Sequence, residues 1–303
     1  MGNRIWHRGR QRDGIASVRS VAALAIALLG CWIPAQDAVA ARLKTKPNQI
    51  RIQYVPPTDP QHQALYSQMR EGRALEDLQQ LLSPLRLPDP LLLRVSGCEG
   101  IKNAWSGAGI VNICYELLAD ILQNAAESDL PIGISKADTI IGPVLDVFLH
   151  ETAHSVFRML KIPILGREED AADQFAAYLT LKLGGSEARR MVLGTAYGYK
   201  REVPGNEVSV PVRTLADEHS LPAQRLYTLL CLAYGADQKL FADIVAKGFL
   251  PEERAAGCAV EYGDLDFAMT KLIRPYVDMQ LAKKFRVVWT RTISARRERL
   301  LRR

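Results

Sequence analysis

The stretch VFLHETAHSV, residues 147–156, decides the fold and chemistry of this chain because it contains the pattern HExxH. On an α-helix, side chains four residues apart project from nearly the same face, about 6 Å from each other. His150 and His154 can therefore bind one metal ion. Glu151 projects about 100° around the helix, close enough to reach a water molecule on that ion. The pattern predicts a zinc-binding helix.

The residues around this pattern predict that the helix is buried. Between 144 and 160 the sequence is apolar on all sides of the helix, and the motif supplies the ionisable groups between 147 and 157. Burying three such groups without a partner would cost several kcal/mol, and a bound metal ion would remove that cost. We expect the helix to start at Gly142-Pro143, because proline is tolerated in a first helical turn. The alternative is a pair of ordinary core histidines.

A second helix is predicted from about 168 to 183, after a turn that contains Pro163 and Gly166. Glu169 as third ligand would give two histidines, one carboxylate and an open position for water, which is the arrangement of catalytic zinc sites. Asp173, one turn later, would accept a hydrogen bond from the free nitrogen of a liganding histidine. Glu168 and Asp170 remain alternative ligands, and such an acidic run could also simply complement the helix dipole.

HExxH followed by ExxxD, here Glu169 to Asp173, resembles the gluzincin clan of zinc peptidases. In that clan the carboxylate after HExxH comes from a second helix. The longer string from His150 to Ala176 is similar to an uncharacterised family of bacterial metallopeptidases of this type, and the similarity covers roughly residues 48–275. Further matching pieces are Cys114-Tyr-Glu-Leu, Asp217-Glu-His219-Ser, Gln224-Arg225-x-Tyr227, Cys231-Leu-Ala-Tyr-Gly235 and Cys258-x-x-Glu261-Tyr262.

The resemblance implies that His150, His154 and Glu169 are zinc ligands and that Glu151 is the general base. The gap between His154 and Glu169 is shorter than in better-known gluzincins, which implies a tight hairpin of two helices. We expect one Zn²⁺ per chain, and hydrolysis of peptide bonds by a water that zinc activates and Glu151 deprotonates. The expected partner is a peptide or protein substrate.

A donor is needed for the oxyanion that forms during such hydrolysis. His219, near Asp217, is the predicted donor, with Tyr227 and Arg225 as further candidates. His219 could instead cap the helix that starts at Pro222. Two other functions stay open: a zinc-binding scaffold without catalysis, and a metal-dependent amidase that acts on cell-wall peptides.

Residues 1–40 have the pattern of a secretory signal peptide. Five arginines precede or flank the apolar run Val21–Ile33, and Ala38-Val39-Ala40 is a small-residue cleavage site. The run is too short for a comfortable membrane span, although an uncleaved anchor is an alternative. A second alternative is a lipoprotein in which Cys31 is lipidated. We expect a periplasmic or secreted protein, cleaved near Ala40.

The cysteines agree with export. Beyond Cys31 there are four, an even number, which allow three pairings in an oxidising compartment. We predict the local pairs Cys98–Cys114 and Cys231–Cys258, with free buried thiols as the alternative. A cysteine zinc site is not expected, because the chain has no CxxC spacing.

Positive charge is concentrated at the C-terminus. The chain carries +6 overall, while residues 283–303 hold nine basic residues and one glutamate, a net +8. This tail could contact an anionic membrane surface or dock on the protein through its apolar face. Export argues against nucleic acid. The residues of this face, at helical spacing with arginines between them, are Phe285, Val288, Trp289, Thr292 and Ile293.

We predict an α+β fold, predominantly α, on the plan of zincin metallopeptidases. The signal peptide is 1–40, the metallopeptidase domain 41–275, and the basic tail 276–303. A small sheet and the active-site helix occupy the domain to about 185, and a helical half follows.

The sheet is expected to contain the strand Ile50–Val55 and a hairpin region from Leu91 to Cys114. Helices are predicted for Gln61–Leu82 and Tyr115–Ala126, and from Pro222 to about 234. The segment Gly109–Cys114 is the expected edge strand, which could hold an extended peptide through backbone hydrogen bonds.

Overall fold

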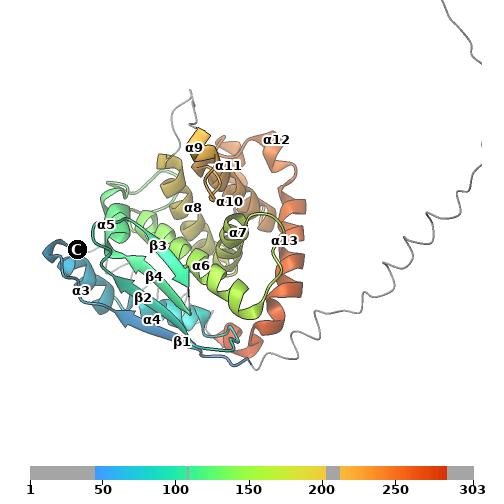
Figure 1. The fold of residues 1–303 in the computed structure, drawn as a ribbon. Helices are drawn as coiled ribbons and strands as arrows, with labels where there is room; N and C mark the ends of the chain where they lie inside the picture. Colours follow the sequence, from blue (N-terminus) through green and yellow to red (C-terminus); the bar gives the residue numbers. More distant parts are fainter. Residues whose placement is uncertain (1–44, 108, 203–211, 285–303) are drawn as a thin grey trace, which may run out of the picture. The chain divides into compact units, whose positions relative to one another are not determined.

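The computed structural model describes residues 45–107, 109–202 and 212–284. In this part the chain is an α+β protein, mainly helical, with one small sheet (Figure 1). The predicted signal peptide, with Cys31, and the tail from 285 lie outside the described residues, so those predictions stay predictions. Among the described helices, none is both long enough and apolar enough to cross a membrane.

The N-terminal elements form the sheet and its cover. They are β1 (Ile50–Tyr54), η1 (Pro60–His62), α3 (Gln63–Glu71), α4 (Ala74–Leu82), β2 (Leu91–Ser96), β3 (Ala104–Gly107), β4 (Ile110–Cys114) and α5 (Tyr115–Gln123). The rest of the described chain is helical. Its elements are α6 (Asp138–Leu160), α7 (Glu168–Leu181), α8 (Gly185–Glu202), α9 (Val212–Leu215), α10 (Pro222–Ala236), α11 (Ala242–Ala246), α12 (Glu252–Ala255), α13 (Cys258–Leu272) and η2 (Arg274–Tyr276).

The sheet has the strand order β1-β2-β4-β3. β1 pairs parallel with β2, and β2 pairs parallel with β4, with Leu93 opposite Val111. The hairpin is formed by β3 and β4, which are antiparallel, rather than by β2 and β4. The prediction that Gly109–Cys114 is the edge strand is therefore wrong: β4 is internal and β3 is the edge.

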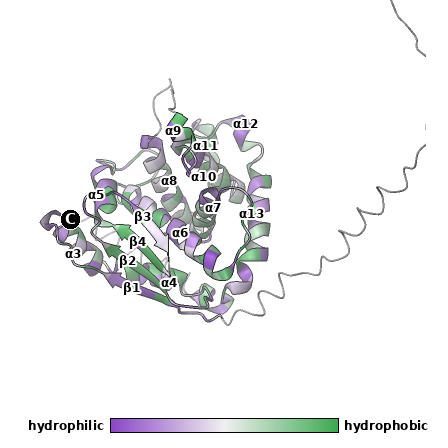
Figure 2. Ribbon diagram, viewed as in Figure 1, coloured by the Kyte–Doolittle hydropathy of each residue, from purple (hydrophilic) through white to green (hydrophobic). Residues whose placement is uncertain are grey.

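The difference between β3 and β4 has a simple cause. From Val111 to Cys114 every residue of β4 is buried, so both of its edges and faces need cover, whereas β3 is partly exposed throughout. The two central strands are mostly hydrophobic (Figure 2), as expected for parallel strands inside a sheet. α4 packs against β1 and β2, and α6 packs against β3 and β4.

The helix predicted over Gln61–Leu82 is broken in two. Arg73 adopts a left-handed conformation with φ 54°, which ends the first helix before α4 begins. The hydroxyl of Tyr54 accepts a hydrogen bond from the backbone N–H of Leu75 at 2.7 Å, so a strand residue satisfies the first turn of α4. No local pattern in 61–82 reveals that contact.

α6 begins at Asp138, four residues before the predicted start at Gly142-Pro143. Pro143 is the sixth residue of the helix and therefore lacks only one intrahelical hydrogen bond. Close packing against α8 holds this end: a Cβ added to Gly194 would lie 2.0 Å from the backbone oxygen of Asp138, and one on Gly142 would lie 2.6 Å from that of Met191. The two helices thus meet backbone to backbone.

Both local disulfides predicted from the sequence are present. Cys98–Cys114 joins the loop after β2 to the end of β4, and Cys231–Cys258 joins α10 to the start of α13. Closing loops of 16 and 27 residues stabilises a fold by about 3 kcal/mol each. Disulfides of this kind indicate a protein that folds outside the reducing cytoplasm.

Candidate metal centre

Two consecutive antiparallel helices, α6 and α7, carry the residues of the predicted site. α6 ends at Leu160, the next residue, Lys161, turns the chain with a φ of 54°, and α7 begins at Glu168 after a short loop. From Phe148 to Phe157 every residue of α6 is buried. The all-round apolar sequence of α6 therefore places its two histidines inside the protein, facing the first turn of α7.

Four side-chain atoms converge in front of α6. The Glu169 Oε2 atom lies 3.0 Å from His150 Nε2, 3.3 Å from His154 Nε2 and 3.0 Å from His219 Nε2. The Nε2 atoms of His150 and His154 are 3.2 Å apart. The structure thus brings together the three residues predicted as ligands and adds His219 beside them.

The other ring nitrogens of the two α6 histidines have carboxylate partners. His150 Nδ1 lies 2.8 Å from Asp173 Oδ1, and His154 Nδ1 lies 2.8 Å from Glu168 Oε1. An ionised carboxylate only accepts hydrogen bonds, so each Nδ1 carries a proton, and each Nε2 is the atom left to bind a metal ion. With both rings neutral, two lone pairs and one carboxylate oxygen would face one point and would repel each other unless a cation lay between them.

The spacing of these donors fits zinc. A tetrahedral zinc ion with ligands at 2.0–2.1 Å separates neighbouring ligand atoms by about 3.3 Å. The separations among His150, His154 and Glu169 are 3.0–3.3 Å. Two imidazoles and one carboxylate also form a donor set that zinc prefers.

The two alternative ligands are directed elsewhere. The Glu168 carboxylate binds His154 Nδ1, and Asp170 Oδ1 accepts a hydrogen bond of 2.6 Å from the hydroxyl of Ser220. Of the three acidic residues at the start of α7, Glu169 is the one whose carboxylate lies between the histidines.

The electrostatics of the site favour a positive charge. Burial lowers the pKa of His150, but its hydrogen bonds to Asp173 and Glu169 together raise it to about 9. The pKa of Glu169 is lowered to about 2, first by the hydrogen bond from His150 and also by the neighbouring histidines. A divalent metal ion bound between His150 and Glu169 would replace the proton that the neighbouring carboxylates stabilise on His150.

Arg225 holds Asp173 in place from α10. Its Nε and Nη2 atoms donate to the two carboxylate oxygens of Asp173 at 2.7 and 2.6 Å, and its guanidinium lies over the ring of Tyr199. Burial raises the pKa of Asp173, but the bonds from His150 and Arg225 lower it below its usual range. Arg225, a candidate oxyanion donor in the sequence, therefore binds Asp173 in the structure.

His219 stands at the mouth of the site. Its ring stacks on that of His150, with centroids 5.8 Å apart, and its Nδ1 lies 3.3 Å from Asp217. The side chain is 42% exposed, so a substrate can reach it. The cap proposed for His219 is not observed, because Gln224 accepts the N–H of Leu221 at the start of α10.

A cleft of about 660 Å³ opens in front of these residues. Glu151, which is 9% exposed, lies on its wall together with the edge strand β3. Burial raises the pKa of Glu151 above its usual range. Tyr227, the third oxyanion candidate, is not among the residues that line this cleft within the described part of the chain.

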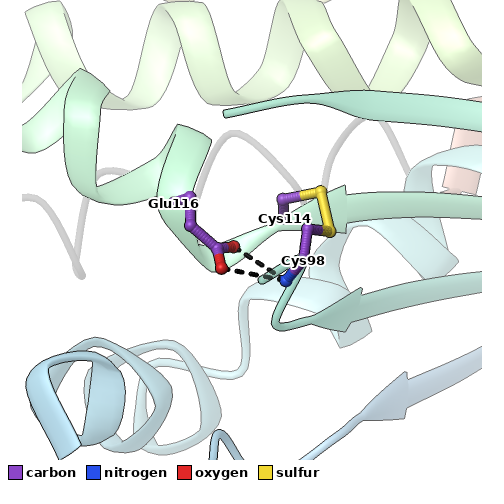
Figure 3. A group of neighbouring side chains, drawn as sticks. All are labelled: Cys98, Cys114 and Glu116. Atoms are coloured by element: carbon purple, nitrogen blue, oxygen red, sulfur yellow. Dashed lines mark hydrogen bonds between the residues drawn. A yellow bond between two sulfur atoms is a disulfide. The ribbon is translucent and has the colours of Figure 1, made fainter. Parts of the chain in front are cut away.

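A second group of metal-binding residue types lies at the end of β4. Cys98, Cys114 and Glu116 are close together, but the two sulfurs are bonded to each other, and the Glu116 carboxylate accepts the backbone N–H of Cys98 (Figure 3). Because neither thiol is free, this group stabilises a loop and is no metal site.

Asp146 and Tyr199, which line the cleft, were not among the residues predicted from the sequence. The Tyr199 hydroxyl donates to Asp146 Oδ2 at 2.7 Å. Asp146 lies one helical turn before His150 and thus on the same face, a spacing that could have singled it out. Tyr199 lies on α8, and nothing in its local sequence points to the site.

The comparisons with known proteins agree with this geometry. A family model described as "Putative metallopeptidase" (DUF4344) matches residues 54–273. No curated protein and no solved structure matches the chain. The matched region contains α6, α7 and α10, and hence every residue of the candidate centre, and the chain belongs to this family.

Proposed function

We propose that the protein is an exported zinc metallopeptidase that hydrolyses peptide bonds with Glu151 as general base. The observation that carries the proposal is the convergence of His150 Nε2, His154 Nε2 and Glu169 Oε2 beside Glu151 on the wall of one cleft. These three atoms would hold the ion, one per chain. The fold supports the zincin plan: a small sheet beside the active-site helix, then a helical half.

Bound zinc would supply Lewis acidity, which polarises a peptide carbonyl and lowers the pKa of water. Glu151 takes up the proton of the attacking water at its carboxylate and then delivers it to the leaving amine. Burial supports this role because it raises the pKa of Glu151 towards the range of an efficient acid and base.

His219 is proposed to stabilise the oxyanion. Its Nδ1 faces the Asp217 carboxylate, and its Nε2 faces the site, where an Nε2–H would donate to a substrate oxygen. The bond between Ser220 and Asp170 ties the loop that carries His219 to the helix that carries Glu169. Both contacts fix the ring before substrate arrives.

The edge strand β3 is proposed to bind the substrate backbone. Asn103 O accepts from Cys114 N, and hydrogen-bonded pairs alternate along an antiparallel ladder. The backbone groups of Ala104 and Ser106 therefore face away from β4, and both residues line the cleft. An extended peptide could pair with this edge.

The test uses the purified mature protein and its Glu151→Gln variant. Wild type should contain about one zinc per chain and cleave members of a peptide library. E151Q should keep the metal and lose cleavage by a factor of at least about 100. The control Glu71→Gln, an exposed residue of α3, should behave as wild type.

Other results would decide against the proposal. Zinc without cleavage of peptides or peptidoglycan fragments would indicate the scaffold function, and cleavage of peptidoglycan fragments alone would indicate the amidase. For export, the mass of the periplasmic or secreted protein should correspond to a first residue near Ala41. A lipid-modified Cys31 would instead show the lipoprotein.

A further inference from the structure

The cleft extends well beyond the metal centre, along the N-terminal half of α6. Residues of α6 line it on every turn from Thr139 to Arg158, a length of about 28 Å at 1.5 Å per residue. At the N-terminal end its other walls are α5 and α8. This part of the cleft, which we call the α5–α8 end, lies beside Glu151 and is large enough to take a substrate side chain.

The α5–α8 end has apolar walls. Leu117 and Ile121 of α5 face it together with Pro143 and Val147 of α6. Gly198 of α8 keeps it open, because a Cβ there would lie 3.4 Å from the Pro143 ring. Walls of this kind suit the aliphatic part of a side chain.

Asp146 is the buried charge at this end of the cleft. It is 8% exposed and lines the cleft, and its Oδ2 atom accepts the Tyr199 hydroxyl. Among the described residues, no donor makes a hydrogen bond to its other oxygen, and no cation forms a salt bridge with it. A buried carboxylate is costly unless a cation lies near it.

The cations that line this end of the cleft are already engaged. Arg225 donates both of its bonds to Asp173, so two carboxylates share one guanidinium. Lys102 pairs with Asp120, and Arg201 donates to the backbone oxygen of Asn124. Burial raises the pKa of Asp146 to about 6, with Asp173 adding to the effect and Arg225 opposing it.

A second carboxylate, Glu202, also lines this end of the cleft. It belongs to the last turn of α8 and has no ion pair among the described residues. The α5–α8 end therefore combines apolar walls with two carboxylates, Asp146 and Glu202, that form no salt bridge among the described residues.

We propose that the α5–α8 end of the cleft is a specificity subsite for a lysine or arginine side chain next to the cleaved bond. The aliphatic stem packs against the apolar walls, and the cationic head binds Asp146, with Glu202 at the mouth. This inference rests on the proposed peptidase function, and it names the class of substrate that the site prefers.

The test compares two fluorogenic octapeptides that differ in one side chain beside the cleaved bond, lysine or norleucine. Wild type should cleave the lysine peptide with a kcat/KM about tenfold higher. In Asp146→Asn, which can still accept from Tyr199, this ratio should fall below about twofold. Glu202→Gln, at an exposed position that should not affect folding, should lower it by about threefold, and Asp264→Asn on the exposed side of α13 should leave it unchanged.

The ratio of kcat/KM for the lysine peptide to kcat/KM for the norleucine peptide distinguishes two roles of Asp146: binding the substrate's lysine, or only supporting the structure of the site. If both peptides slow equally in D146N and the ratio stays the same, Asp146 only supports the site and the inference is wrong. Equal cleavage of the two peptides by wild type would also show that the inference is wrong. Binding of the same peptides to E151Q, measured by fluorescence anisotropy, tests the subsite apart from catalysis. Tighter binding of lysine without any turnover in wild type would uphold the subsite and reject the peptidase.

Discussion

The two sides of the cleft are built differently. The side of the proposed metal centre comes from one continuous stretch, α6 and α7, whose residues 150–173 include both histidines, the proposed base, the proposed carboxylate ligand and Asp173. The side proposed to bind substrate combines the edge strand β3, helices α5 and α8, and the loop with His219, and its residues are up to 115 positions apart, from Ala104 to His219. The comparison indicates that the chemistry is encoded locally, whereas specificity depends on the tertiary fold.

The largest expected effect is the loss of zinc when Glu169 is substituted, compared with substitution of its neighbours on α7. Glu169→Ala should reduce zinc to less than about 0.1 per chain after dialysis, because one of the three proposed ligands is lost. Glu168→Ala and Asp170→Ala are the matched controls and should retain most of the metal. Metal analysis of the three variants checks this. If E168A or D170A loses the zinc and E169A keeps it, the ligand assignment is wrong.

A second prediction concerns pH in the metal-free protein. The pKa of His150 is about 9 in the folded state, so the folded protein holds this proton more tightly than the unfolded chain does. The stabilisation is complete below about pH 6.5 and is lost as the pH rises towards 9. The Tm of metal-free protein should therefore fall over this range.

Hydrogen exchange can show whether the loss of stability at high pH is confined to α6 and α7. Amides of α6 and α7 should lose protection as the pH rises, after correction for the intrinsic rate, while those of β2 and β4 should not. Asp173→Asn, which removes a hydrogen bond that raises the pKa of His150, should flatten the dependence. An equal change in the sheet would show that the two regions are not independent.

The smallest expected effect is on the substrate-binding side. Gly198→Ala puts a methyl group 3.4 Å from the Pro143 ring and narrows the α5–α8 end of the cleft. We expect kcat/KM for peptides with bulky side chains to fall by about two- to fivefold, with zinc content unchanged. A change in zinc content would show that the two sides are coupled through α8.

What the sequence could and could not predict follows the same division. The metal-binding helices and the start of α7 depend on local periodicity, and α7 was placed to within two residues of its end. The edge strand was misassigned because the apolar run of β4 gives no hint of which neighbour covers it. Tyr199 could not be identified from the sequence because its partner, Asp146, lies 53 residues away on another helix.

The break between α3 and α4 could not be predicted either, because it also depends on a contact with a distant residue. The hydroxyl that satisfies the first turn of α4 belongs to Tyr54, on a strand 21 residues earlier. Contacts of this kind are decided by packing and not by propensity. The disulfides, in contrast, followed from spacing alone, since both join the nearest cysteines.

Anomalous diffraction at the zinc edge from crystals of the purified protein tests the central claim most directly. We predict one strong peak per chain, within about 2.0–2.2 Å of His150 Nε2, His154 Nε2 and a carboxylate oxygen of Glu169. No peak at this point at near-neutral pH, or a peak bound by Glu168 or Asp170 in place of Glu169, would contradict it.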